Sequence, residues 1–372
     1  MLFLMCILYL FCYSNDLLKH SARENESITR TRWLLPHYRY LVTSSRAGNE
    51  NRGEPRQPRG LHLGAPMTLQ SLQVNYFEAI ANMSDRVAQI ASHLNYPKGM
   101  LAGQVAIITG SGQGIGAEAA RLFANEGAKV VVSDIDGKKA QQVADSITVA
   151  GGQAISVPGD MLSADYITTL VAKAAEFGGG KIHHIVNNAG YTWDGVIHKM
   201  TDKQWDTIIA LHSTAPFRLV RAAAPYFRVK DGENRCVVNI SSTSGVHGNA
   251  GQANYAMAKA GVTGLTKTIA KEWGPAFGVR ANTVAFGFIK TRLTDAKEKG
   301  AFITGPDGEK IALGIPQAQK AAGAAEQDAH ADIPLRRPGS PTEAASAVLA
   351  VVSPLFSYVS GQTIMVTGGR NM

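Results

Sequence analysis

The feature that most constrains the fold is an alternation, from Leu101 onward, of short apolar runs with segments of helical spacing. The runs are rich in β-branched residues and predict strands at Val105–Thr109, Lys129–Asp134, Ala154–Pro158, His183–Asn188, Cys236–Ile240, Arg280–Ala285 and Gln362–Thr367. The segments between them predict helices at Ile115–Asn125, Lys138–Val149, Ala164–Glu176, Asp202–Phe227 and Ala253–Lys271. Alternating strands and helices form parallel sheets with helices on both faces and right-handed crossovers. We therefore expect an α/β fold built on a doubly wound parallel sheet.

The chain divides by composition into three parts. Residues 1–66 open with an apolar run, Met1 to Tyr13, that is shorter than the ~18 residues a membrane-spanning helix needs. The rest of that part is rich in Arg, Ser, Asn, Gly and Pro, so we expect a disordered or targeting extension without a firm membrane span. Residues 67–100 predict an N-terminal helical segment, and residues 101–372 predict a single catalytic domain. We expect an intracellular protein, cytoplasmic or mitochondrial.

Charge and cysteine content exclude several classes of function. The net charge is +8, but nine Arg and Lys residues and only five acids precede Met67, so half of the excess lies in the extension. No basic stripe follows, which gives nucleic-acid binding little support. Cys6, Cys12 and Cys236 are too few and too scattered for a metal site or a disulfide framework, and we expect no bound metal.

The stretch from Asn239 to Gly261 carries the candidate chemistry. Ser242 follows a predicted strand, and Tyr255 and Lys259 lie one helical turn apart, with Cβ atoms about 5–6 Å from each other. A tyrosine hydroxyl has an ordinary pKa near ~10, and a nearby ammonium group favours its phenolate. Ser242 is suited to hold a substrate oxygen while Tyr255 transfers its proton, which is carbonyl and alcohol interconversion. A Y-x-x-x-K pair also arises as a tyrosine packed on a lysine stem, so the flanking motifs decide.

A glycine-rich loop, T-G-S-G-Q-G-I-G from Thr109 to Gly116, closes the first predicted strand and opens the first helix. Its glycines let the backbone approach a pyrophosphate, and the amino end of the helix supplies N–H donors. Asp134 ends the second predicted strand, where an acid can accept hydrogen bonds from ribose hydroxyls. The sequence therefore predicts a dinucleotide site.

Together these motifs resemble the short-chain dehydrogenase/reductase family over about residues 101–372. In that family a serine lies thirteen residues before the tyrosine, which selects Ser242. The stretch G-N-A-G-Q-A-N-Y-A-M-A-K-A-G is similar to the 3-oxoacyl-(acyl carrier protein) reductase branch. The resemblance implies a Rossmann-type domain, an NAD(P) cofactor and a homotetramer assembled partly through the carboxyl terminus.

The resemblance also implies which residues bind the cofactor. The motif T-G-x-x-x-G-x-G marks the glycine loop, N-N-A-G packs along the cofactor, and Ile289 and Thr291 match positions that contact the nicotinamide carboxamide. Asp160 matches an aspartate that reaches the adenine edge, although it is also a typical turn residue after Gly159. The full set is Gly110, Ser111, Gln113, Gly114, Ile115, Gly116, Asp134, Asp160, Met161, Asn188, Ala189, Gly190, Tyr255, Lys259, Gly287, Ile289 and Thr291.

Two positions depart from the family pattern. His212 stands where the family usually has an active-site asparagine, whose backbone carbonyl helps to hold a water that contacts the lysine. A relay through the backbone survives this change, and His212 either joins it as a fourth catalytic residue or is a buried histidine without a role. Phe286 replaces the usual proline before Gly287.

Asp134 predicts NAD(H) as the preferred cofactor, because a carboxylate beside a 2′-phosphate would repel NADP. NADP(H) remains possible, since Lys138 and Lys139 follow closely, whereas Gln113 supplies no compensating charge.

The predicted function is reduction of a 3-oxoacyl thioester, or oxidation of the 3-hydroxyacyl form, in fatty acid metabolism. A polyol, steroid or xenobiotic carbonyl dehydrogenase is the enzymatic alternative, and a cofactor-binding regulator without turnover is the alternative of another class. The segment from Asp295 to Asp332 is rich in Ala, Gln, Lys and Gly and predicts a mobile helical lid over the substrate, or a surface insertion without a role.

Overall fold

The structure is a computed structural model that describes residues 98–305, 308–315 and 330–370. The extension expected over residues 1–66 lies outside the described residues, and so does the helical segment expected over residues 67–100, apart from its last three residues. Within the described part of the chain, no helix is long and apolar enough to cross a membrane.

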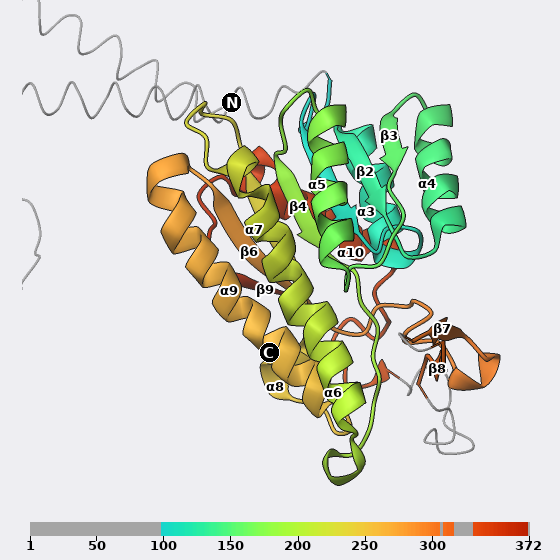
Figure 1. The fold of residues 1–372 in the computed structure, drawn as a ribbon. Coiled ribbons are helices and arrows are strands. Elements are labelled where there is room, and N and C mark those ends of the chain that lie inside the picture. Colours follow the sequence, from blue (N-terminus) through green and yellow to red (C-terminus); the bar gives the residue numbers. More distant parts are fainter. Residues whose placement is uncertain (1–97, 306–307, 316–329, 371–372) are drawn as a thin grey trace, which may run out of the picture. The chain divides into compact units, whose positions relative to one another are not determined.

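Seven strands form one parallel sheet in the order β3-β2-β1-β4-β5-β6-β9 (Figure 1). They are β1 (Val105–Thr109), β2 (Lys129–Ser133), β3 (Gln153–Ser156), β4 (His184–Asn187), β5 (Cys236–Ser242), β6 (Arg280–Phe286) and β9 (Thr363–Val366). The chain runs outward from β1 to β3 and then returns to place β4 on the other side of β1. This reversal makes a crevice at the carboxyl ends of β1 and β4, where open α/β sheets bind ligands.

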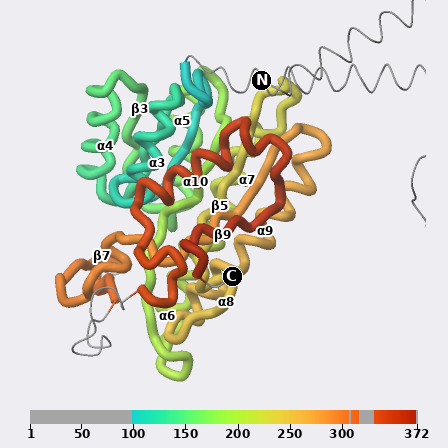
Figure 2. Tube along the Cα trace, turned by 180° about the vertical axis from the view of Figure 1, so that it is seen from behind, coloured from blue at the N-terminus to red at the C-terminus, as the bar shows by residue number. Residues whose placement is uncertain are grey.

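Helices cover both faces of the sheet, which confirms the doubly wound fold (Figures 1 and 2). One layer holds α3 (Gly114–Asn125), α4 (Gly137–Val149) and α10 (Pro341–Val352), and the other holds α5 (Ala164–Phe177), α7 (Ala215–Phe227) and α9 (Ala253–Phe277). Successive strand residues feed the two layers, since Ile107 packs with the α5 layer and Ile108 with the α3 layer. Both side chains are fully buried, as expected for a parallel sheet covered on both sides.

Several predicted elements differ in detail from the structure. The single helix expected over Asp202–Phe227 consists of α6 (Asp202–Ile209), a π-helical turn (Ala210–Thr214) and α7. Two described helices were not predicted, namely α8 (Thr243–His247) and α10. The described part of the segment from Asp295 to Asp332 contains a short 3₁₀ turn (Lys297–Lys299) and a two-stranded hairpin, β7 (Phe302–Thr304) and β8 (Lys310–Ala312). The expectation of a helical lid is therefore wrong for these residues.

Phe286 is the last residue of β6, where it lies opposite Ser242 of β5 and Val366 of β9. Its side chain is buried in the α3 layer of the core. Unlike the usual proline, it keeps its N–H and can continue a strand. With phenylalanine in place of the usual proline, β6 continues by one paired residue beyond its predicted end at Ala285.

A buried chain of polar side chains fastens α9 to the sheet. Asn187 Nδ2 donates to Asn239 Oδ1, and Asn239 Nδ2 donates to Thr266 Oγ1, both at 2.8 Å. Thr283 Oγ1 also lies 2.8 Å from Thr266 Oγ1, which in turn donates to the Val262 carbonyl at 2.8 Å. The chain joins β4, β5 and β6 to one face of α9. Because these groups satisfy one another, their burial costs little.

Arg280, at the start of β6, ties α10 to the sheet. Its guanidinium is buried and donates to the carbonyls of Val351 at 2.8 Å and Val352 at 3.0 Å, and to Asn234 Oδ1 at 3.2 Å. The last carbonyls of a helix have no partners within the helix, and a cation there also interacts favourably with the helix dipole. Arg280 therefore acts as the carboxyl-terminal cap of α10.

Replacing Arg280 by Gln should lower the free energy of unfolding by about 2–4 kcal/mol, because buried carbonyls lose charge-assisted hydrogen bonds. Urea unfolding measures the change. Arg121→Gln is the control, since it removes an exposed ion pair with Glu118 and should cost less than about 0.5 kcal/mol. A loss at Arg280 no larger than this control would contradict the proposed cap.

Candidate active site

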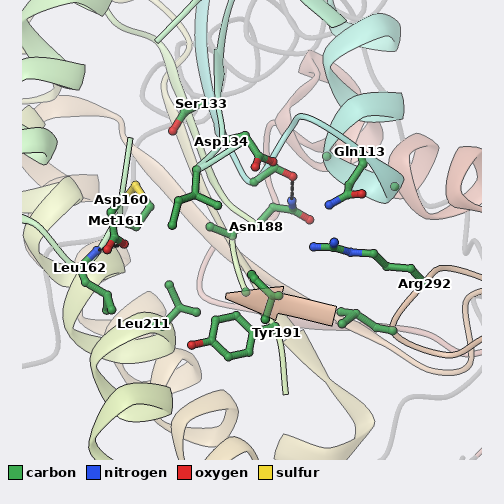
Figure 3. A pocket seen from close by; sticks show the side chains of 18 of the residues that line it. Gln113, Ser133, Asp134, Asp160, Met161, Leu162, Asn188, Tyr191, Leu211 and Arg292 are labelled. Carbon is green, nitrogen blue, oxygen red and sulfur yellow. Dashed lines mark hydrogen bonds between the residues drawn. The ribbon is translucent and has the colours of Figure 1, made fainter. Parts of the chain in front are cut away.

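A pocket with a volume of about 370 Å³ opens at the carboxyl ends of the strands, at the crevice between β1 and β4, and Figure 3 shows the side chains that line it. Eleven predicted cofactor residues line it: Gly110, Gln113, Gly114, Ile115, Gly116, Asp134, Asp160, Met161, Asn188, Ala189 and Gly190. Six other predicted residues do not, namely Ser111, Tyr255, Lys259, Gly287, Ile289 and Thr291. Sequence reasoning missed further lining residues, among them Tyr191, Leu211, Arg292, Leu293, Ile303 and Thr304.

The glycine loop fits a bound phosphate group because its backbone is tightly packed from behind and open in front. A Cβ at Gly110 would lie 2.7 Å from Ala189 Cα, and a Cβ at Gly116 would lie 2.4 Å from the Gly110 carbonyl oxygen. Gly114 has a positive φ of 59° and nothing within 4 Å of its Cβ position, and it begins α3. The amino end of α3 thus faces the pocket with free N–H donors, which suits an anionic ligand.

Hydrogen bonds hold the ends of β1 and β4 together beneath this loop. Asn188 Nδ2 donates to the carbonyls of Thr109 at 2.9 Å and Gly110 at 3.0 Å. Thr109 Oγ1 accepts from the backbone N–H groups of Asn188 and Ala189, both at 3.0 Å. The N-N-A-G segment therefore fixes the shape of the glycine loop as well as lining the pocket.

Asp134 lies directly after β2, at the edge of the pocket, with 8% of its surface exposed. Its Oδ2 accepts the backbone N–H of Gly112 at 2.8 Å, and its Oδ1 accepts that of Asp136 at 2.9 Å. A Cβ at Gly112 would lie 2.9 Å from this carboxylate, so glycine is needed for the contact. Each oxygen keeps a lone pair for a further donor.

Three other predicted residues, Asp160, Ser111 and Thr291, use their side chains in local hydrogen bonds. Asp160 Oδ1 accepts the backbone N–H of Leu162 at 2.9 Å and also lines the pocket, so it forms the turn and remains available to a ligand. Ser111 is buried, and its hydroxyl donates to the Ile108 carbonyl at 2.6 Å. Thr291 Oγ1 accepts the Leu293 N–H at 3.3 Å, which shapes the loop after β6.

Ser242, Tyr255 and Lys259 meet where β5 ends and α9 begins. Ser242 caps α8 by accepting the Ser244 N–H at 3.2 Å, and its hydroxyl is close enough to Tyr255 to lower the pKa of that phenol. The Lys259 ammonium donates to the Ile240 carbonyl at 2.6 Å and lies 5.6 Å from the Tyr255 ring centroid. Lys259 is only 4% exposed, so its nitrogen is turned toward β5.

The pKa values of this pair differ from the sequence expectation. Desolvation raises the pKa of Tyr255 to about 12, and the nearby Ser242 hydroxyl opposes this shift only in part. Burial lowers the pKa of Lys259 to about 7. The expectation that the lysine holds the tyrosine pKa below its ordinary value is therefore wrong for the protein without a ligand, because burial has the larger effect.

His212 lies in the π-helical turn, a distortion that is frequent at functional sites. Its Nε2 is 2.8 Å from the Tyr191 carbonyl oxygen, and its ring meets the Tyr255 ring edge to face at 5.1 Å. Burial, and then the charge of Lys259, place the pKa of His212 well below its ordinary value, so the imidazole is neutral. Nε2 must therefore carry the proton, which leaves buried Nδ1 as an acceptor without a partner among the described residues.

Comparisons with known proteins agree with this architecture. Residues 104–301 match the sequence profile of the short chain dehydrogenases, and residues 308–371 match that of enoyl-(acyl carrier protein) reductases. A solved structure of a short-chain dehydrogenase/reductase, glucose/ribitol dehydrogenase, from Brucella melitensis superposes with a TM-score of 0.60 at 26% identity, covering 74% of this chain and 99% of that one.

Curated relatives are more similar in sequence. The 3-oxoacyl-[acyl-carrier-protein] reductase FabG of Thermotoga maritima is 35% identical over 269 residues, which are 72% of this chain and 98% of that protein. The FabG of Vibrio cholerae is 38% identical over 274 residues, 73% of this chain and 99% of the relative. With the sheet, the glycine loop and the meeting of Ser242, Tyr255 and Lys259 already described, these matches show that the chain belongs to the short-chain dehydrogenase/reductase family of oxidoreductases.

Proposed function

We propose that the protein interconverts a ketone and a secondary alcohol, with Tyr255 as the proton donor and acceptor and Ser242 as the residue that holds the substrate oxygen. The observation that carries this proposal is that Ser242, at the end of β5, lies close enough to Tyr255 to lower the pKa of its hydroxyl. A bound NAD(P) supplies or accepts the hydride. The chain's own residues orient the oxygen, move its proton and keep water from the lysine.

The protonation states favour the reductive direction in the protein alone. A tyrosine with a pKa near 12 is neutral at pH 7 and is ready to give a proton to a developing alkoxide. Oxidation needs the phenolate, which must be favoured by positive charge. Lys259 has a pKa near 7, so it can take up a proton near neutral pH and supply this positive charge. An oxidised nicotinamide ring would supply further positive charge when bound.

His212 completes the proposed catalytic set as a neutral residue. Its Nε2–H donates to the Tyr191 carbonyl, which lies in the pocket wall, and its ring supports the Tyr255 ring from the side. The low pKa argues against a proton relay that charges the imidazole near neutral pH. We therefore infer that His212 positions Tyr255, and that any relay passes through backbone carbonyls.

For the substrate we propose a 3-oxoacyl thioester in fatty acid metabolism. The support is the identity of 35% and 38% to two relatives named as 3-oxoacyl-[acyl-carrier-protein] reductases. A polyol, steroid or xenobiotic carbonyl dehydrogenase is the alternative, and the structural similarity to a glucose/ribitol dehydrogenase at 26% identity favours its polyol form. A regulator without turnover is the third candidate. The buried Lys259 argues against it, because desolvation of its amine lowers stability and a protein without turnover has no use for that cost.

For the cofactor we propose NAD(H), with NADP(H) as the alternative. The carboxylate of Asp134 is fixed at the pocket edge by two backbone N–H groups, so it cannot easily turn away from a 2′-phosphate. We also propose a homotetramer, as is typical of the family, in an intracellular compartment, cytoplasmic or mitochondrial.

Replacing Tyr255 by Phe should lower kcat at least about 100-fold, because only the proton donor is lost. The measurement is NADH oxidation with acetoacetyl thioesters, compared with simple ketones and polyols under the same conditions. Cofactor affinity, followed by nucleotide fluorescence, should stay within about twofold. Near-normal turnover in the variant would remove Tyr255 from its role, and a preference of the wild type for polyols would favour the alternative substrate class.

Lys259→Met should stabilise the protein, and the gain should depend on pH. The folded-state pKa of Lys259 is lowered from 10.5 to about 7, so the unfolded chain binds a proton between these values while the folded chain does not. Stability is therefore lost as pH falls through this window. The variant should unfold with a free energy higher by more than about 1 kcal/mol at pH 6.5, and the gain should shrink by pH 9.5.

Urea unfolding at the two pH values measures this gain. Lys271→Met, which removes an exposed lysine from the same helix, is the matched control. Equal effects of Lys259→Met at both pH values would contradict the low pKa.

Asp134→Ala should lower the ratio of kcat/KM for NADH to that for NADPH by about tenfold or more, because a like charge beside the 2′-phosphate is removed. Steady-state kinetics with both cofactors measures the ratio before and after the change. Asp136→Ala, which removes a neighbouring carboxylate outside the pocket wall, is the control. A wild-type preference for NADPH, or an unchanged ratio, would overturn the assignment.

A further inference from the structure

The pocket is lined by a cationic side chain, Arg292, that belongs to none of the motifs described above. Arg292 follows Thr291 in the loop after β6, is half-buried, and lines the pocket together with Gly114 and Gly116 of the glycine loop. In Figure 3 its side chain extends into the pocket below Gln113. The loop after β6, far from the glycine motif in sequence, thus brings a guanidinium into the pocket that the amino end of α3 also faces.

The side-chain amide of Gln113 separates Arg292 from a second cation, Lys139. With the amide oxygen toward Arg292, it accepts from Nη2 at 2.7 Å; with the amide reversed, it accepts from Lys139 Nζ at 3.3 Å. The first orientation is favoured, because its hydrogen bond is shorter and Lys139 already has an ion pair with Asp136 at 3.2 Å. Gln113 therefore orients the guanidinium.

Arg292 makes no ion pair with a carboxylate among the described residues. Desolvation in the pocket lowers the pKa of Arg292 from its ordinary value, and the charges of Asp134 and Asp136 oppose this shift. Arginine nevertheless stays charged at neutral pH. A partly buried cation whose described partner is one neutral amide has donors left over, and its planar fork is suited to two oxygens of a phosphate.

We propose that Arg292 binds the pyrophosphate of the dinucleotide cofactor and supplies the positive charge that the glycine loop lacks. The inference rests on the NAD(P) site of the proposed function. The pyrophosphate is favoured because Arg292 lines the pocket together with Gly114 and Gly116, at the amino end of α3. Asp134, Gly112 and Lys139 gather on one side of Gln113, where the ribose hydroxyls are expected, since a Cβ at Gly112 would lie 2.9 Å from the Asp134 carboxylate and 3.0 Å from Lys139 Cβ. Arg292 contacts the same Gln113 amide and is also influenced by the charges of Asp134 and Asp136, so binding of ADP-ribose and of 2′-phospho-ADP-ribose distinguishes the two phosphates.

The test measures binding of cofactor fragments by calorimetry and needs no turnover. Arg292→Met should weaken ADP-ribose by at least about tenfold, the effect of losing one charge-assisted hydrogen bond, and should leave adenosine within about twofold. Arg292→Lys should restore part of the affinity, because it keeps the charge without the planar fork. The salt dependence of ADP-ribose binding should be weaker in Arg292→Met than in the wild type.

Lys139→Met is the matched control, since it removes the cation on the other side of Gln113 and should affect ADP-ribose less than threefold. Equal losses in the two variants would overturn the inference in favour of a general electrostatic field. A loss confined to 2′-phospho-ADP-ribose would overturn the assignment to the pyrophosphate. Unchanged ADP-ribose affinity in Arg292→Met would refute the inference and leave the cofactor site intact, whereas a wild type that binds no fragment would refute the proposed function as well.

Discussion

The hydroxyl of Thr266 sets the position of the helix on which the catalytic side chains depend. It accepts hydrogen bonds from Asn239 and Thr283 and donates to its own helix, which uses all of its capacity. Because Lys259 lies seven residues earlier on the same helix, close to two turns, it shares the face that Thr266 fixes against the sheet. A rotation of α9 would break buried hydrogen bonds, so the distance between β5 and the catalytic pair is held by polar contacts as well as by apolar packing.

Much of the fold could be predicted because its signals are local. Most strands of the sheet are short runs rich in β-branched residues, and the glycine loop marks the first strand-to-helix turn. The break in the helix over Asp202–Phe227 was missed although Pro216, two residues after the π-helical turn, has no N–H for the His212 carbonyl, which is a signal visible in the sequence. α10 was missed although Ser340 and Glu343 form a capping box before its apolar residues, a signal that sequence reasoning can use.

The site was harder to predict where chemistry depends on packing between distant segments. Arg292 lies in no motif, and only the fold of the loop after β6 brings it to the glycine loop. The expected lid is rich in Ala, Gln and Lys as a whole, but Phe302–Thr304 has strand-forming residues and the sequence G-P-D-G follows it. The local signal for the hairpin with Lys310–Ala312 was therefore overlooked. The pKa of Tyr255 was predicted in the wrong direction, because spacing reveals the charge of Lys259 but not the desolvation of the two groups by the surrounding fold.

Gly190 lies directly against the imidazole of His212, so the two residues must be considered together. A methyl group at residue 190 would lie 2.0 Å from His212 Cε1, and the same imidazole packs edge to face with the Tyr255 ring. Since Gly190 also lines the cofactor pocket, the pocket wall, the imidazole and the phenol form one stack of contacts. The two positions therefore constrain each other sterically: with the imidazole placed as it is at 212, residue 190 has no room for a side chain.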